Sequence, residues 1–323
     1  MLETIEETLR QLRVAMESHR RSLAAEGAPL PPGPSPVPSG RLAEVYAEIE
    51  RTAGVHVSAT VAVKLEKLFV ASDTAALAEW VRRIRRPGPM HPDLQLLIES
   101  LTTHETFLFR DKGQLELLRT DILPALIARA RTTGERRLRL WSAGCSSGEE
   151  AYSLAVVVLA ALADAGEAIA ANGRVTPLPD WRIEVLGTDI SGRAIDAATA
   201  GVYGTTGLSS FRAVPPELLH YFPPGEADAT RRVCAELRRI VRFQRLNLMD
   251  IAPPLVECDV VACRNVLIYL TDAATRHVHE LVHRALMPGG ALLLGPADSL
   301  LEPARYRSHA TNRGVIHCRL GSP

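Results

Sequence analysis

The chain has 323 residues, of which 46% are hydrophobic, and this ordinary globular composition is enough for two domains. Lysine plus arginine and aspartate plus glutamate both total 37, so no net charge draws the chain to nucleic acid or to an anionic membrane. The five cysteines contain no CxxC pair, which argues against a disulfide framework and a thiolate zinc site. Neither an apolar signal core nor the roughly 18 apolar residues of a membrane span occur, so we expect a cytoplasmic protein.

The first 40 residues divide into a predicted helix and a linker. From Leu2 to Leu23 six apolar side chains and His19 recur at alternating steps of three and four, which predicts a heptad helix over residues 1–27. This helix could bind a partner helix, as in a coiled coil, or lie on its own domain, and about three heptads do not decide between the two. Residues 28–40, APLPPGPSPVPSG, are rich in proline, which excludes helix and predicts an extended linker.

Residues 41–100 and residues 101–323 show two different patterns. The first range has helical periodicity, with a predicted C-cap at Gly54 and a Pro-Gly stop after VRRIRR, and indicates a small all-α domain. In the second range, helical stretches such as DAATRHVHELVHRAL alternate with short apolar runs: LRLWSAG, RIEVLGTD, CDVVACRNVLIYL and GGALLLGP. This alternation predicts a doubly wound α/β domain.

The segment LRLWSAGCSSGEEAYSLA, residues 138–155, combines an apolar strand, a turn from Gly144 to Gly148 and a helix that begins at Glu149 and Glu150. Glycines let a ligand approach the backbone, and the N–H groups of a helix start bind anions. Because the two acids would repel a pyrophosphate, the segment favours a ligand with hydroxyls or an ammonium group, such as S-adenosylmethionine. The alternative is a plain strand-to-helix turn whose glutamates favour the helix dipole, which explains the acids but not the whole turn.

Three other segments place polar residues beside apolar runs. Asp189 follows IEVLGT, where nucleoside-binding α/β folds carry a ribose-binding carboxylate, although aspartate after a strand is also a common helix N-cap. Arg264, Asn265 and Tyr269 interrupt an apolar run, where polar groups need partners or a ligand. LTTHETFLFRD, residues 101–111, presents further polar side chains at a domain junction, a favoured place for a binding cleft. The arginine of this segment could equally form a surface ion pair.

Residues 279–283 read HELVH, and two histidines four apart on a helix can share a zinc ion while the glutamate activates a bound water. A metzincin would also need glycine at 286 and histidine at 289, where Leu286 and Gly289 stand. The apolar stripe of the predicted helix leaves His279 and His283 at its flank. We therefore predict no metal site, with both histidines facing the surface or the other domain and the glutamate facing solvent.

Seven blocks of the sequence resemble, in order and approximate spacing, those of the CheR family, the S-adenosylmethionine-dependent protein-glutamate methyltransferases of bacterial chemotaxis. The resemblance covers about residues 41–320. It implies a Rossmann-like class I methyltransferase domain with a small antiparallel β-subdomain inserted at about residues 201–246, preceded by a small all-α domain. The blocks are LTTHETFLFRD, LWSAGCSSGEEAYSLA, VLGTDIS, GVYG, VRFQRLNLMD, VVACRNVLIYL and LMPGGALLLGPADSLL.

The resemblance also implies roles for single residues. Arg264 and Tyr269 are predicted to be catalytic, because they could hold a substrate carboxylate by charge-assisted hydrogen bonds. The family usually has asparagine at the position of His104, and an imidazole would add a titratable charge there. At the methionine end of the cofactor Glu150 matches the family better than Glu149. The predicted cofactor-binding residues are His104, Thr106, Arg110, Glu149, Glu150, Asp189, Asn247, Leu248, Arg264 and Asn265.

The implied function is methyl transfer from S-adenosylmethionine to glutamate side chains of the cytoplasmic domain of a methyl-accepting chemoreceptor. The alternative is a degenerate relative that binds the cofactor and serves as a scaffold or sensor in a chemosensory complex. Two features of the sequence concern the receptor. VSATVAVKLEKLFVASD has Lys64 and Lys67 as its cations, whereas the family's helical domain is richly basic, so the resemblance supports the cofactor more strongly than the receptor. ELRRIVRFQR, residues 236–245, could attract a receptor's terminal carboxylate or be a solvated strand edge.

Overall fold

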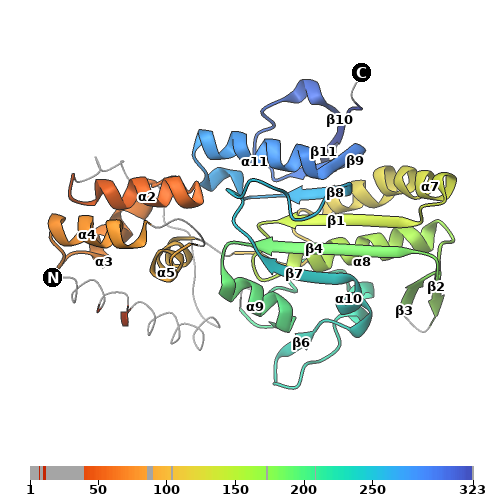
Figure 1. Ribbon diagram of the computed structural model, residues 1–323. Helices are drawn as coiled ribbons and strands as arrows, with labels where there is room; N and C mark the ends of the chain where they lie inside the picture. The colour runs from red at the N-terminus through yellow and green to blue at the C-terminus, as the bar shows by residue number, and fades with distance from the viewer. Residues whose placement is uncertain are drawn as a thin grey trace. The chain divides into compact units, whose positions relative to one another are not determined.

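The computed structural model describes residues 7, 10, 11, 40–85, 90–102, 105–171, 174–207 and 209–321. They form two compact units, which are drawn in Figure 1. The helical unit contains the described residues up to 102 together with Tyr269–Thr275, and the α/β unit contains the remaining described residues. Most of the predicted heptad helix and of the proline-rich linker lies outside the described residues. The exceptions are three positions of the helix and Gly40 of the linker.

The helical unit packs amphipathic helices around Phe69 and Trp80, which are both fully buried. The predicted C-cap is confirmed, since Gly54 ends a helix in the left-handed conformation with φ 68°. A later segment of the chain completes this unit, because the N–H of His56 donates to the carbonyl oxygen of Tyr269 at 2.8 Å. The helices are η1 (Gly40–Leu42), α2 (Ala43–Ala53), α3 (Ala59–Leu68), α4 (Thr74–Ile84) and α5 (Pro92–Leu101).

A seven-stranded sheet forms the centre of the α/β unit, in the order β10-β11-β9-β8-β1-β4-β7. Five of its strands are parallel, and the β10–β11 hairpin pairs antiparallel with β9. The chain passes from β1 to β4 and β7 on one side and then to β8 and β9 on the other, so the strand order reverses between β1 and β8. This confirms the predicted Rossmann-like class. The strands are β1 (Arg137–Ala143), β4 (Arg182–Asp189), β7 (Val241–Arg245), β8 (Cys258–Cys263), β9 (Leu286–Leu294), β10 (Tyr306–Thr311) and β11 (Gly314–Arg319).

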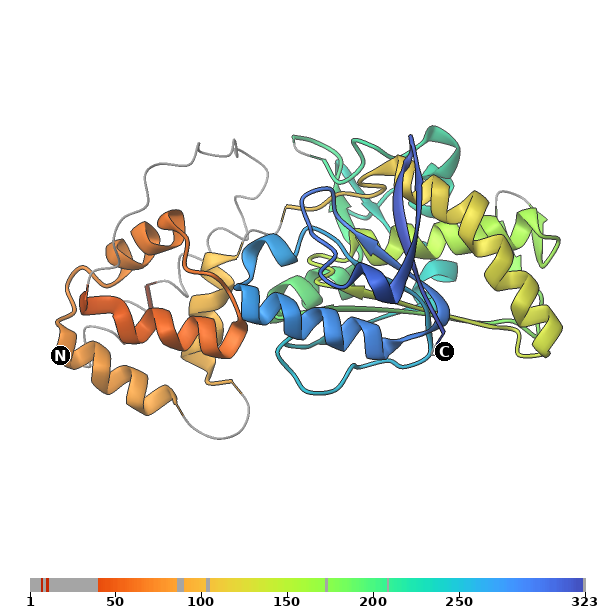
Figure 2. The same ribbon diagram turned by 90° about the horizontal axis from the view of Figure 1, so that it is seen from above.

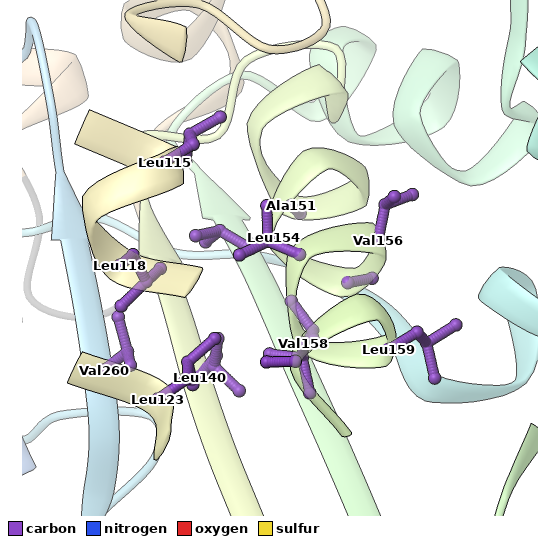
Figure 3. Close-up of a cluster of buried hydrophobic side chains, with 14 of the residues drawn as sticks. Leu115, Leu118, Leu123, Leu140, Ala151, Leu154, Val156, Val158, Leu159 and Val260 are labelled. Atoms are coloured by element: carbon purple, nitrogen blue, oxygen red, sulfur yellow. The ribbon is translucent and has the colours of Figure 1, made fainter. Parts of the chain in front are cut away.

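Successive side chains of each strand point to opposite faces of the sheet. Leu140 of β1 joins the main apolar cluster with Leu154 and Val158 of α8, and Figure 3 shows these side chains between helix and strands. Trp141 lies outside this cluster, and its indole N–H donates to the hydroxyl of Thr188 at 2.9 Å. Figure 2 shows α7 and α8 on one face and α11 on the other. The helices are α6 (Lys112–Leu117), η2 (Leu118–Ile122), α7 (Leu123–Thr133), α8 (Glu149–Asp164), α9 (Gly192–Ala200) and α11 (Asp272–Ala285).

The predicted insert is smaller than expected. Its antiparallel pair is β5 (Val202–Gly204) with β6 (Thr230–Arg232), accompanied by η3 (Pro216–Tyr221) and α10 (Ala235–Ile240). The prediction that it reaches residue 246 is wrong, because Val241–Arg245 is β7, which pairs parallel with β4 at the edge of the main sheet. The basic run at residues 236–245 therefore belongs to α10 and to an edge strand. A hairpin that was not predicted, β2 (Ala168–Ala171) with β3 (Arg174–Pro177), follows α8.

The apolar run at residues 258–270 is also shorter as a strand than predicted. β8 ends at Cys263, because Asn265 adopts a left-handed conformation with φ 59° that no strand can continue. A short 3-10 turn, η4 (Leu267–Tyr269), follows, and a similar turn, η5 (Pro303–Arg305), precedes β10. Among the described residues, none of the helices is both long and apolar enough to cross a bilayer.

Leu140 tests the packing of the main apolar cluster, in which it is fully buried. We expect Leu140→Ala to lower the free energy of unfolding by about 2–5 kcal/mol, because the lost side chain leaves a cavity that its neighbours fill incompletely. Urea unfolding followed by tryptophan fluorescence measures the change. Leu301→Ala removes the same atoms from a side chain that is 42% exposed and should change stability by less than about 0.5 kcal/mol. Equal losses in the two variants would contradict the described packing.

Candidate active site

Three parallel strands end side by side where the strand order reverses. In the β1–β4 register Ala143 pairs with Thr188, and in the β1–β8 register Ser142 pairs with Ala262. The residues that follow these strands therefore reach the same edge of the sheet. In open α/β sheets the crevice at this switch point, outside the carboxyl ends of the strands, is where ligands bind.

The turn after β1 is held by Asp189 at the end of β4. The Asp189 carboxylate accepts hydrogen bonds from the N–H groups of Ser146 and Ser191, both at 2.9 Å, and the residue is 8% exposed. Gly144 has φ 79°, and a β-carbon there would lie 2.5 Å from a methyl group of Val266. The alternative role of Asp189 as a helix N-cap is not supported, since the N-cap of α9 is Ser191. A carboxylate oxygen has two lone pairs, and one hydrogen bond from a described residue reaches each Asp189 oxygen, so a ligand hydroxyl could use the second.

A buried arginine connects the end of β8 to two acids. The guanidinium of Arg264 donates to Glu150 at 3.2 Å and to Asp111 at 2.7 Å, and its side chain is 2% exposed. It also donates to the carbonyl oxygen of Arg110 at 2.7 Å. Glu150 accepts a second hydrogen bond, at 2.7 Å, from the hydroxyl of Ser142. Burial raises the pKa of Glu150, and Arg264 and Ser142 oppose that rise by stabilising the carboxylate.

The neighbouring acid Glu149 has different contacts. Its carboxylate accepts hydrogen bonds from the hydroxyls of Ser147, at 2.7 Å, and Ser210, at 2.8 Å, and Glu149 is 3% exposed. Burial raises the pKa of Glu149, and the two serine hydroxyls lower it. Because Ser210 belongs to the insert, Glu149 links α8 to the insert. Glu150 is instead bound by Arg264.

The loop before α6 carries Thr106 and Arg110 and is anchored from two directions. The N–H of Phe109 donates to the hydroxyl of Ser153 in α8 at 2.9 Å. From the insert, the Arg212 guanidinium lies 3.7 Å above the ring of Phe107. The guanidinium of Arg110 donates to the carbonyl oxygen of Glu105 at 3.2 Å, within the same loop. The other predicted residue of this segment, His104, lies outside the described residues.

Backbone strain is concentrated in these segments. Among the described residues, six other than glycine have positive φ, and four of them lie in the loops just described: Phe109, Asp111, Ser146 and Asn265. Such conformations are unfavourable for residues with a β-carbon and persist where surrounding contacts impose them. The strain therefore indicates a site whose geometry is imposed by the fold.

The predicted adenine-side residues follow the edge strand β7. The N–H of Leu246 donates to the carbonyl oxygen of Asp189 at 2.9 Å, and Asn247 and Leu248 directly follow Leu246 in the chain. The side-chain oxygen of Asn247 accepts from the N–H of Met249 at 3.1 Å and shapes the turn. The predicted catalytic Tyr269 belongs to the helical unit, in which it is 43% exposed. The structure thus groups the other described candidates within the α/β unit and assigns Tyr269 to the helical unit.

The HELVH histidines each have a partner in the α/β unit. His279 is 7% exposed, with its Nε2 2.9 Å from the carbonyl oxygen of Ser299, and this corrects the expectation that it faces the surface or the other domain. His283 contacts the Tyr306 hydroxyl at 3.2 Å, and burial lowers the pKa of both histidines. Glu280 is bound to an arginine at the surface. In the part of the chain that the structure describes, no three histidine, cysteine or acidic side chains are grouped as metal ligands.

Comparison with known proteins decides the family. The model of the CheR methyltransferase, SAM binding domain, matches residues 104–315. This chain belongs to the CheR methyltransferase family. It is 33% identical to chemotaxis protein methyltransferase 1 of Pseudomonas aeruginosa, over 83% of this chain and 94% of that relative. It is 31% identical to chemotaxis protein methyltransferase Cher2 of Pseudomonas putida, over 80% and 88%, and 33% identical to chemotaxis protein methyltransferase 1 of Vibrio cholerae, over 68% and 74%.

Membership confirms the predicted enzyme class and S-adenosylmethionine as the cofactor of this CheR methyltransferase. The alternative of a non-catalytic scaffold is accordingly set aside. The residues at the strand ends fit this cofactor, which supplies a methyl group bound to a positively charged sulfur. Buried Oδ1 of Asn265 and Nε of Arg264 have no hydrogen-bond partner within the described residues. Because buried polar atoms are normally paired, the Asn265 acceptor oxygen and the Arg264 N–H fit a ligand that supplies hydrogen-bond partners at the strand ends.

Four residues that hydrogen-bond to candidate site residues were not predicted: Asp111 binds Arg264, Ser142 binds Glu150, Ser146 binds Asp189 and Asp298 binds Asn265. All four lie inside quoted sequence blocks, and Ser142 is a polar residue within a buried strand, which was an available signal. The others could not be found from the sequence, because their partners, such as Arg264 for Asp111, are far away along the chain.

Asp189 tests the nucleoside end of the cofactor site. We expect Asp189→Asn to weaken S-adenosylhomocysteine binding at least about tenfold, because hydrogen bonds to a charged group contribute roughly 1.5–3 kcal/mol. Isothermal titration calorimetry measures the affinity. Asp196→Asn makes the same change at an exposed position of α9 and should bind within about twofold of the wild type. Unchanged binding by folded Asp189→Asn would remove Asp189 from the site.

Glu149 provides a test of buried charge. Since its pKa is raised in the folded state, the folded protein binds this proton more tightly than the unfolded chain, so stability falls as pH rises from the ordinary value of 4.5 through the raised pKa. We expect Glu149→Gln to increase the melting temperature at pH 8, because a neutral amide can contact both serines. The gain should shrink as pH falls towards 5, as calorimetry would show. Glu217→Gln, at an exposed position, should change little, and a pH-independent effect of Glu149→Gln would contradict the assignment.

Proposed function

We propose that this enzyme transfers the methyl group of S-adenosylmethionine to glutamate side chains of a chemoreceptor's cytoplasmic domain, forming γ-methyl esters and S-adenosylhomocysteine. We also infer that it acts in the cytoplasm, where such a domain is accessible. The relatives are named chemotaxis protein methyltransferases, which supports a protein substrate in chemotaxis. The proposal that glutamate is the acceptor rests on the chemistry of the site.

The observation that carries the proposal is that the acids at the strand ends are already engaged. Asp189 accepts from two backbone N–H groups, and Glu150 and Asp111 are bound by Arg264. A hydroxyl or ammonium acceptor would need a base to remove its proton, whereas a glutamate carboxylate is ionised at neutral pH. A site whose acids are committed to structure therefore suits an acceptor that needs no deprotonation. Its contribution is to align the reacting groups and exclude water.

The roles of the site residues follow from their contacts. Thr106, Arg110 and Glu150 would hold the methionine end of the cofactor, and Asp189 with Asn247 and Leu248 would hold the nucleoside. We replace the predicted catalytic role of Arg264 with a positioning role, because its terminal nitrogens bind Glu150, Asp111 and a carbonyl oxygen and its side chain is 2% exposed. Tyr269 keeps its predicted role near the acceptor as part of the proposal.

Receptor recognition is assigned to the helical unit. Its helix α3 presents Lys64 and Lys67 at exposed positions, together with the exposed side chain of Val63. Two exposed cations beside an exposed apolar side chain favour a receptor helix that combines acidic with apolar residues. The predicted contact through residues 1–27 lies outside the described residues and is left as a prediction.

A labelled methyl transfer assay tests the acceptor. With methyl-labelled S-adenosylmethionine and receptor fragments from the same cell, we expect label that mild alkali releases as methanol, because carboxylate methyl esters hydrolyse in base. Receptor fragments whose candidate glutamates are replaced by glutamine should remain unlabelled. Arg110→Ala should lower kcat/KM for the cofactor at least about tenfold, as expected for a lost charged contact of roughly 1.4 kcal/mol or more. Alkali-stable label would indicate another acceptor and would contradict the proposal.

A further inference from the structure

Asp298 joins the two loops that follow strands β8 and β9. Its Oδ2 accepts hydrogen bonds from the N–H groups of Asn265, at 2.5 Å, and Gly295, at 2.9 Å. Its Oδ1 accepts from the N–H of Ile268 at 3.3 Å. Since β8 and β9 are parallel neighbours, one carboxylate fixes both loops at the carboxyl edge of the sheet. We call these four residues the Asp298 clamp.

The clamp holds Asn265 in the left-handed conformation, which asparagine adopts more readily than most residues with a β-carbon. Asn265 has φ 59°, and its side-chain oxygen is buried with no hydrogen-bond partner among the described residues. Gly295 leaves no space beside it: a β-carbon there would lie 2.7 Å from the backbone nitrogen of Asn265 and 2.8 Å from Oδ2 of Asp298. The amide of Asn265 is thus rigidly placed while its acceptor oxygen stays available.

The loop that carries Asp298 is itself anchored by the HELVH helix. His279 lies 2.9 Å from the carbonyl oxygen of Ser299, and because a carbonyl can only accept, Nε2 must carry the proton and donate. Burial raises the pKa of Asp298, while the backbone N–H groups of the clamp lower it. The titratable neighbours that interact with this carboxylate are Cys263 and His279. An ionised carboxylate is the form that can accept all three N–H groups.

We propose that Asp298 is a positioning residue for S-adenosylmethionine: through the clamp it orients the Asn265 amide so that its free oxygen accepts a hydrogen bond from the cofactor. Asp298 does not itself touch the cofactor in this proposal. A loosened clamp would let Asn265 leave the left-handed conformation and lose that contact. The inference rests on the cofactor site and not on the glutamate acceptor, so cofactor binding tests it without any receptor.

The first experiment compares binding of S-adenosylhomocysteine by calorimetry. Asp298→Asn offers one acceptor oxygen and an NH₂ donor in place of two acceptor oxygens, so it cannot accept from all three N–H groups, and affinity should fall at least about tenfold. Gly295→Ala places a methyl group in the clamp without changing charge and should weaken binding similarly. Glu302→Gln, an exposed acid of the same loop, is the matched control and should bind within about twofold of the wild type. Binding by folded Asp298→Asn within twofold of the wild type would overturn the proposal.

A second measurement uses the unaltered protein and separates positioning from a purely structural role. Carbon-13 NMR of the assigned Asp298 carboxyl gives its pKa with and without S-adenosylhomocysteine. If the ionised clamp favours binding, linkage requires the pKa of Asp298 to be lower in the complex. An unchanged pKa would contradict the inference even if the variants failed to fold. Failure of the wild type to bind S-adenosylhomocysteine would instead contradict the cofactor site, and failure of methyl transfer with normal binding would concern the proposed acceptor alone.

Discussion

The buried guanidinium of Arg264 is the interaction on which the active-site region depends. Its side chain is 2% exposed, and a cation in that position is tolerated because Glu150 and Asp111 neutralise it. Removing one partner of such a buried pair commonly costs about 3–5 kcal/mol, since the remaining charge is left without compensation. Through these contacts Arg264 links the end of β8, the first turn of α8 and the loop before α6. Arg264, Glu150 and the loop that carries Arg110 therefore form one connected structure and are not independent side chains.

The topology explains why this network lies where it does. Strand order reverses between β1 and β8, so the connections leave in opposite directions and the loops after these strands separate. The loops in turn are held in unfavourable backbone conformations at Phe109, Asp111, Ser146 and Asn265. Contacts from the surroundings offset this strain, including the hydroxyl of Ser153 and the carboxylates of Asp189 and Asp298. Rigid loops suit a methyl transfer that depends on alignment more than on proton transfer.

Buried acids give the same region a characteristic electrostatic signature. Burial raises the pKa of Glu149, Glu150 and Asp298, so the folded protein binds each of these protons more tightly than the unfolded chain does, and stability falls as pH rises through each raised pKa. Perturbed acids of this kind gather at functional sites, although structural networks also produce them. Here hydrogen bonds from serine hydroxyls, backbone N–H groups and Arg264 keep the carboxylates in use as acceptors. The buried carboxylates thus maintain the geometry of the site at some cost in folding stability above their ordinary pKa values.

The sequence by itself determined the elements whose signals are local. Alternating apolar runs predicted the parallel sheet and Gly54 predicted a helix end, because periodicity and glycine conformation act over a few residues. The turn from Gly144 to Gly148 followed by Asp189 also predicted a nucleoside site, and this stays a prediction. The seven ordered blocks added the family. No other part of the sequence supported the short motif HELVH as a metal site. In the fold its first histidine, His279, contacts the carbonyl oxygen of Ser299 in the loop after β9.

The tertiary structure decided what depends on partners distant in the chain. Arg264 meets Glu150 across 114 residues and Asn265 meets Asp298 across 33, and no local pattern encodes such pairs. Adjacent Glu149 and Glu150 look alike in sequence but point to different neighbours, because successive helix residues are rotated by roughly 100°. The end of the insert was misplaced for the same reason: pairing with β4, rather than composition, makes Val241–Arg245 a strand of the main sheet.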